Sequence, residues 1–114
     1  MKKIKIPEPV HIRDVNDNLL FEDENKTVPC LLTFKQVLEK TILLDNKFGV
    51  NLNGIMMAAN IKNKLNQNSE VLELENEEWE KLWEVTQNPT GGYNTVYSIQ
   101  LIDFFMAIMK ATDA

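Results

Sequence analysis

Residues 72–85 read LELENEEWEKLWEV and hold six glutamates and two tryptophans. Residues 71–75 alternate apolar and charged side chains, which predicts a short strand with Leu72 and Leu74 on the buried face. Asn76 is a good N-cap residue for a helix that follows directly. The stretch therefore predicts a strand that runs straight into a helix.

The predicted helix has two contrasting sides. Glu77, Glu78 and Glu80 fall in its first turn, where the helix dipole favours negative charge. Trp79, Leu82 and Trp83 follow the spacing i, i+3, i+4 and share one side. The main interpretation is that the tryptophans face the core and the carboxylates face water. The alternative is an exposed acidic and aromatic docking face.

The rest of the chain is balanced in charge. The 114 residues carry a net charge of −5, and residues 70–84 alone carry −6, so the remainder carries +1. A nucleic-acid binder shows a basic patch, and here the basic residues are scattered, so direct nucleic-acid binding is not expected. This length and the 44% hydrophobic fraction favour one globular domain spanning 1–114.

Cysteine usage and hydropathy bear on the compartment. Cys30 is the single cysteine, so no internal disulfide can form, and it is interpreted as a small buried hydrophobe rather than a reactive thiol. The basic start MKKIKIP lacks the apolar region of a signal peptide. No window approaches the roughly 18 apolar residues of a membrane span. We expect a cytoplasmic protein.

The first 32 residues predict β structure. Residues 10–15 alternate apolar and polar side chains, and residues 19–21 follow the turn formers Asn16, Asp17 and Asn18, which predicts a hairpin. Residues 28–32 predict an edge strand, or one that begins only at Pro29, because proline cannot donate to a ladder.

Helices are predicted over 33–114. A capping box, Thr33 to Gln36, opens the first, whose apolar face is Phe34, Val37, Leu38, Thr41 and Ile42. The second runs from about residue 52 to 67, before a turn at 66–69. Its predicted core stripe is Leu52, Ile55, Met56 and Ala59, extended by Ile61 and Leu65, and its predicted solvent side is Asn60, Lys62, Asn63 and Lys64.

The final third contains a glycine-containing loop and the most apolar helix. Residues 88–94, NPTGGYN, break the tryptophan helix, and Gly91 and Gly92 predict a mobile turn rather than a phosphate site, since no Gly-Lys-Ser or Gly-Lys-Thr follows. Residues 98–110 predict one helix with a narrow polar stripe. It is either the central helix of the domain or a contact with a second copy in a homo-oligomer.

No constellation for catalysis or metal binding emerges. Residues 14–18, DVNDN, resemble the start of a calcium loop, but the glycine and glutamate required later are replaced by Leu19 and Asn25. His11 is the single histidine, and zinc needs more such ligands. Clustered carboxylates on an exposed helix turn lack the apolar pocket that separates acid from base. We therefore expect no enzyme activity, no cofactor and no metal.

One resemblance extends from Leu32 through the C-terminal region. The segments LTFKQVL, KFGVNLNGIMMAANIKNKL, VLELENEEWEKL and GYNTVYSIQLIDFFMAI are similar to small uncharacterised accessory proteins of tailed-bacteriophage operons. The N-terminal hairpin is not covered, and LELENEEWEKL and GYN are the most distinctive parts. Because such proteins often lie near morphogenesis genes, the resemblance implies a role in virion or tail assembly. It carries no catalytic residues.

These observations predict an α+β fold, in which an N-terminal β-hairpin (1–32) precedes a small bundle of about four helices (33–114). The expected function is that of a non-enzymatic protein-binding accessory protein whose partner is a phage structural protein or a host protein. The alternative is a host-directed inhibitor, acting against a defence or transcription protein, whose acidic face imitates nucleic acid. The candidate protein-binding residues are Glu77, Glu78, Glu80, Gly91, Gly92 and Tyr93.

Overall fold

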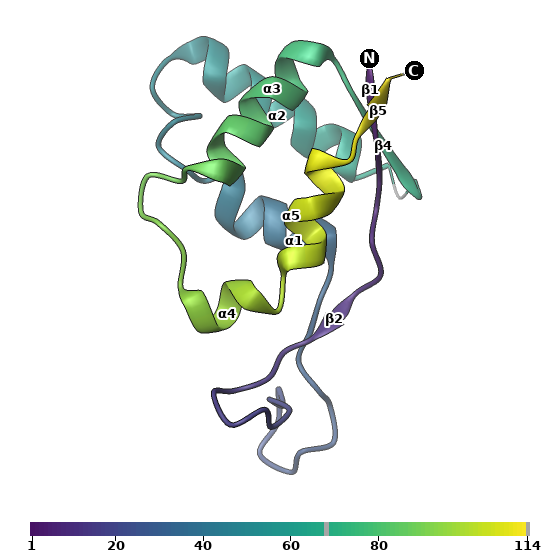
Figure 1. The fold of residues 1–114 in the computed structure, drawn as a ribbon, viewed down its shortest axis with the longest axis vertical. Helices are drawn as coiled ribbons and strands as arrows, with labels where there is room; N and C mark the ends of the chain where they lie inside the picture. The colour runs from purple at the N-terminus through teal and green to yellow at the C-terminus, as the bar shows by residue number, and fades with distance from the viewer. Residues whose placement is uncertain (68, 114) are drawn as a thin grey trace.

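The computed structural model describes residues 1–67 and 69–113 and has the predicted α+β fold (Figure 1). A three-stranded antiparallel sheet in the order β4-β1-β5 lies at one end of a group of helices. A second, two-stranded sheet, β2-β3, forms the base of an arm that extends away from the helices. The molecule is elongated, with principal extents of 44 × 29 × 21 Å.

The strand at the N-terminus, β1 (Lys2–Lys5), is the centre of the larger sheet. It pairs antiparallel with β4 (Val71–Leu74) and with β5 (Thr112–Asp113). The prediction that Leu72 and Leu74 face inward is confirmed, and Ile4 opposite Leu72 is fully buried with them. The pattern KKIK did not predict β1, because one apolar residue among three lysines carries no clear period.

Lysines of β1 are placed against acidic groups of the neighbouring strands. The Nζ atom of Lys2 lies 2.8 Å from Oδ1 of Asp113 and 4.8 Å from the ring centroid of Trp79. Lys3 lies opposite Glu73 in the ladder, with 3.8 Å between charged atoms. Part of the acidity of residues 70–84 is therefore balanced by the basic N-terminus.

Helix α3 (Asn76–Gln87) follows β4 without a loop, as predicted. Its N-cap is Glu75 rather than Asn76. Trp79 and Trp83 pack against the core as partly buried side chains, and the indole Nε1 of Trp79 donates to the carbonyl of Ile108 at 2.8 Å. The core-facing interpretation of the tryptophans is confirmed.

The first predicted helix is a short α-helix, α1 (Phe34–Val37), continued by a π-helical turn, η1 (Leu38–Ile42). The predicted capping box is present: the Thr33 amide donates to Gln36 Oε1 at 3.0 Å, and the Gln36 amide donates to Thr33 Oγ1 at 3.1 Å. Four of the five predicted apolar-face residues are buried, whereas Thr41 is exposed.

The predicted core stripe of the second helix, α2 (Leu52–Leu65), is confirmed for its extension, Ile61 and Leu65, and is wrong for the other four residues. Leu52, Ile55, Met56 and Ala59 are exposed, and the buried residues are Gly54, Ile61 and Leu65, with Met57 and Ala58 packed beside them. The turn before the helix explains this orientation, because a Cβ on Gly54 would lie 2.3 Å from the carbonyl oxygen of Phe48. The turn that contains the buried Phe48 thus packs against the side of α2 that carries Gly54.

One predicted wet-side residue of α2 also proves partly buried. Lys64 turns toward α3, where its Nζ lies 2.6 Å from Oε1 of Glu78. The turn predicted at 66–69 includes Asn68, which lies outside the described residues.

The predicted single C-terminal helix is divided into α4 (Thr95–Ile99) and α5 (Ile102–Met109). Leu101 has non-helical backbone angles and is fully buried between them. Phe104 and Ile108 of α5 are buried in the core. The ring of Phe104 packs edge to face against that of Phe34, with 5.9 Å between the ring centroids. Ile99, Ile102 and Met109 are exposed, so the expectation of burial around most of this helix is wrong.

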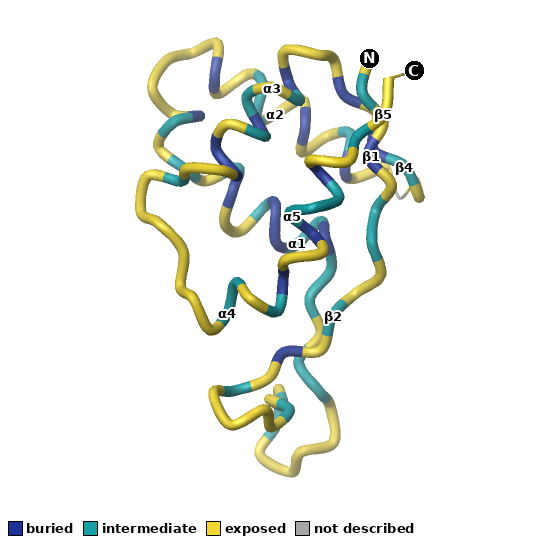
Figure 2. Tube along the Cα trace, in the orientation of Figure 1, coloured by how far each residue is buried: buried dark blue, intermediate teal, exposed yellow. Residues whose placement is uncertain are grey.

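The arm comprises residues 10–32, and Figure 2 shows that most of it is exposed or half-buried. β2 (Val10–His11) pairs with β3 (Leu31–Leu32). The predicted hairpin is formed by the residues that follow β2: Arg13 and Leu19 make an antiparallel bridge, and the Leu20 amide donates to the Ile12 carbonyl at 2.9 Å. A second isolated bridge joins Phe21 to Pro29. The predicted turn is present, with a positive φ of 64° at Asp17.

The arm is fastened to the helices by the side chain of Gln100. Its Oε1 accepts from the Arg13 amide at 2.6 Å, and its Nε2 donates to the Arg13 carbonyl at 2.8 Å. The same Nε2 donates to the Val96 carbonyl of α4. Among the described residues, no helix is long and apolar enough to cross a membrane.

The close approach at Gly54 yields a stability prediction. We expect Gly54→Ala to destabilise the fold by about 1–3 kcal/mol, because the added methyl meets backbone that cannot rotate away. Urea unfolding monitored by tryptophan fluorescence measures the change. Gly49→Ala is the matched control, since its Cβ would meet Asn46 at an ordinary 3.6 Å. Equal stability of the two variants would contradict the orientation of α2.

Candidate functional site

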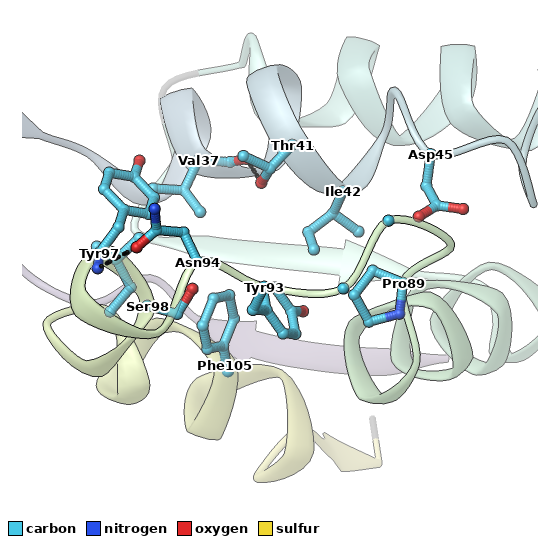
Figure 3. A pocket seen from close by; sticks show the side chains of 13 residues that line it. Val37, Thr41, Ile42, Asp45, Pro89, Tyr93, Asn94, Tyr97, Ser98 and Phe105 are labelled. Atoms are coloured by element: carbon cyan, nitrogen blue, oxygen red, sulfur yellow. Dashed lines mark hydrogen bonds between the residues drawn. The ribbon is translucent and has the colours of Figure 1, made fainter.

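A pocket of about 300 Å³ lies between the α1–η1 segment and the loop that joins α3 to α4 (Figure 3). This is near the lower limit for a small-molecule or side-chain site. Its apolar walls come from Val37, Ile42, Leu101 and Phe105. The loop, residues 88–94, closes one side, and the complete lining is Val37, Thr41, Ile42, Asp45, Pro89, Gly91, Gly92, Tyr93, Asn94, Tyr97, Ser98, Leu101 and Phe105.

The loop is held at both ends, unlike the mobile turn expected from its glycines. Asp45 accepts from the amide and from the hydroxyl of Thr90, each at 2.7 Å. The Nζ of Lys47 donates to the carbonyl of Asn88. Gly92 has a φ of +67° and donates its amide to the Pro89 carbonyl at 3.1 Å, a conformation that favours glycine.

The carboxylate of Asp45 stays ionised to lower pH than an ordinary aspartate. Desolvation is the largest single influence and raises the pKa of Asp45, but it is outweighed by hydrogen bonds from the Lys47 amide and from Thr90 and by the charge of Lys47. The pKa therefore lies below its usual value. Donors that stabilise the charged form act in this direction.

Tyr93 is turned inward at the end of the loop. Its hydroxyl donates to the carbonyl of Thr86 at 2.5 Å, and its ring lies 5.1 Å from that of Phe105 (Figure 3). Burial, and then the charge of Asp45, raises the pKa of Tyr93. The side chain is part of the pocket wall and is still 39% exposed, so Tyr93 stays a candidate contact residue.

Several polar groups around the pocket are already engaged with the protein. The Thr41 hydroxyl donates to the Val37 carbonyl, and Asn94 Oδ1 accepts from the Tyr97 amide at 3.2 Å. Asp45 holds the loop. Because these groups hold one another, the pocket presents apolar walls with a polar rim, an arrangement suited to holding an apolar group.

The candidate acidic residues divide into two groups. Glu78 is only 5% exposed: its Oε1 accepts from the Glu75 amide at 2.9 Å and pairs with Lys64. Its proposal as a binding residue is therefore not compatible with its burial. Glu77 and Glu80 are exposed, and with Glu84 they follow i, i+3, i+7 along the outer side of α3.

Other residues with chemical potential are not assembled into a site. His11 pairs with Leu31 in the β2–β3 ladder, so the adjacent Cys30 projects to the opposite face of that sheet. Asp14 Oδ1 accepts from the amides of Asn16 and Asn18, each at 2.9 Å. These bonds are those of a turn, as interpreted from the sequence of residues 14–18. The hydrogen bond from the Asn18 amide has the largest effect and, together with that from Asn16, lowers the pKa of Asp14. In the described ranges no three His, Cys, Asp or Glu side chains gather as for a metal ion.

Sequence reasoning identified the loop side of the pocket and missed the opposite wall. Gly91, Gly92 and Tyr93 were singled out for their exposure and lie together at the pocket. Val37 and Ile42 were predicted only as core residues, and no role in a site was predicted for Asp45. The approach of residue 45 to residue 90 is a long-range contact that no local pattern encodes.

The hydrogen bonds of Asp45 predict a pH-dependent loop. Since the pKa of Asp45 is lower in the folded than in the unfolded chain, its stabilising contribution is complete above about pH 4 and is lost as the pH falls through the folded value. We expect the Thr90 amide to exchange hydrogen faster, by about tenfold, at the acid end once intrinsic rates are corrected. Asp45→Asn should remove this dependence. If the Thr90 amide of the Asp45→Asn variant keeps the pH dependence of the wild type, the proposed role of Asp45 is wrong.

The contrast between neighbouring glutamates gives a second prediction. Glu78→Ala should cost about 1–3 kcal/mol of unfolding free energy, because it removes a charged acceptor of two buried or half-buried donors. Glu77→Ala, exposed on the same turn, should change stability by less than about 0.5 kcal/mol. Thermal or urea unfolding of both variants provides the measurement. Equal effects would show that Glu78 is not buried.

Comparison with known proteins adds no assignment. No family model, no curated protein and no solved structure matches this chain.

Proposed function

We propose that this chain is a non-enzymatic protein-binding accessory protein and that the pocket beneath the 88–94 loop receives an apolar side chain of its partner. The observation that supports this most is the combination of apolar walls with several polar groups that are already paired, those of Thr41, Asp45 and Thr90. Protein interfaces are typically anchored by one apolar or aromatic side chain buried in such a pocket.

The proposed partner is a structural protein of a tailed phage, and the process is virion or tail assembly. This part of the proposal rests on the resemblance of residues 32–112 to accessory proteins of phage operons. The shape of the chain is compatible with it, because a rigid pocket and a projecting arm offer contacts to another macromolecule rather than a closed chamber for a substrate.

The alternative, a host-directed inhibitor that imitates nucleic acid, is favoured by a different observation. Glu77, Glu80 and Glu84 form an exposed row along the outside of α3. The row holds three of the seven glutamates of residues 70–84. Of the others, Glu78 is buried and Glu73 lies by Lys3. A partner bound in this way would be released by salt, and Glu77→Lys with Glu80→Lys would abolish its binding.

Filling the pocket tests the principal proposal. Ser98 lines the pocket, and Thr95 lies on the same helix, exposed and outside the lining. With the chain immobilised and challenged with lysate of infected cells, Ser98→Leu should reduce recovery of a virion protein at least tenfold, since the added side chain occupies the space of the partner's anchor. Thr95→Leu should leave recovery unchanged.

Three outcomes would contradict the proposal. The same recovery by Ser98→Leu and wild type would exclude the pocket as the contact. Recovery of a host enzyme that depends on Glu77 and Glu80 would favour the inhibitor. Turnover of a small molecule by the purified chain would exclude a purely binding role.

A further inference from the structure

Helix α2 has a second apolar side that nothing in the described chain covers. Leu52, Ile55 and Met56 are 70%, 51% and 55% exposed, and Ala59 is exposed beside them. Successive helical residues turn by about 100°, so this row is on the side opposite Gly54, Ile61 and Leu65, which enter the core. A surface helix normally presents polar residues there.

The same surface is free of charge. Residues 48–61 include no Asp, Glu, Lys or Arg, although such residues make up 25% of the chain. The nearest charged residues are Lys47 before this run and Lys62 after it. The polar side chains within this run are those of Asn51, Asn53 and Asn60, which can both donate and accept hydrogen bonds.

We propose that this α2 face is a dimer interface, and that its occupant is the α2 face of a second copy, packed antiparallel about a two-fold axis. The interface does not involve the pocket and does not depend on the proposed partner. It replaces the C-terminal helix, the site of self-association expected from sequence.

Self-complementarity of side-chain size favours the antiparallel arrangement. With the axis between residues 55 and 56, Leu52 of each copy meets Ala59 of the other, and Ile55 meets Met56. At each end of the row a large side chain therefore lies against a small one, which favours close packing of the two helices. A parallel pair would instead set Leu52 against Leu52 and leave a gap between the two Ala59 residues.

The positions of the charged residues also favour the antiparallel arrangement. In a parallel pair the two Lys62 residues would lie side by side, and like charges at a contact are destabilising. In the antiparallel pair they lie at opposite ends, each beyond the uncharged run of the other copy. The absence of any charge on the face also argues against an acidic or a basic partner, which would need a charge to recognise.

The available area fits a weak dimer. The row and the adjacent Val50 expose roughly 500 Å² of surface, so two copies would bury on the order of 1,000 Å². This is close to the lower limit for a specific interface. We therefore expect reversible association with a dissociation constant on the order of 10–100 µM.

The first experiment measures mass against concentration. Sedimentation equilibrium of the full chain should show a mass that rises toward that of two chains over roughly 5–500 µM. Ile55→Glu should weaken association at least tenfold, because it places a carboxylate beside the axis, against the apolar Met56 of the other copy. The matched control is Ile99→Glu, which is 60% exposed on α4 and should dimerise as wild type. Circular dichroism confirms that each variant is folded.

The outcomes separate the alternatives. A wild-type chain that remains a monomer up to roughly 500 µM would overturn the proposal, as would dimerisation unaffected by Ile55→Glu. Loss of the dimer in Ile99→Glu but not in Ile55→Glu would place self-association at the C-terminal helices instead.

A cross-linking experiment tests the direction of the helices. In a Cys30→Ser background, a short bis-maleimide should join copies of Met56→Cys, which lie at the axis. It should not join copies of Asn63→Cys, which are separated by roughly 20 Å in the antiparallel pair. Equal cross-linking at both positions would indicate a parallel pair and overturn the arrangement.

Discussion

The pairing of β1 with β4 is the contact on which the rest of this structure depends. It joins the N-terminus to the middle of the chain, and β5 adds the C-terminus on the other edge of the same strand. Ile4, Leu72 and Leu74 are buried by this pairing. α3 leaves β4 directly, so the position of the sheet also sets the direction from which Trp79 and Leu82 enter the core.

Electrostatics and packing act together at this sheet. The acidic stretch 70–84 would be self-repelling alone, and the lysines of β1 meet it at Glu73 and above Trp79. The exposed pair at Glu73 contributes little to stability. Glu78, in contrast, is inside, where it accepts from the start of its own helix and pairs with Lys64 of α2. This pair joins α2 to α3.

Local rules were sufficient where a signal was contained within a few residues. The capping box at Thr33, the direct passage from strand to helix at 75–76 and the inward tryptophans are of this kind. They were not sufficient where two faces of one helix were both apolar. In α2 the larger side chains suggested the core stripe, yet the contact of Gly54 with Phe48 decided which side was buried. Likewise, the pocket depends on Asp45 reaching Thr90, a contact across 45 positions.

The bond between Gln100 and the arm has an implication for how this chain can vary. In the arm, Gln100 forms hydrogen bonds only with the main-chain amide and carbonyl of Arg13, and every residue except proline supplies both groups. Substitution at position 13 should thus be widely tolerated during divergence, whereas position 100 requires a side chain that can donate and accept at once. In distant homologues the arm would keep this attachment while its own sequence changes, and the one residue retained would be the side-chain amide at position 100.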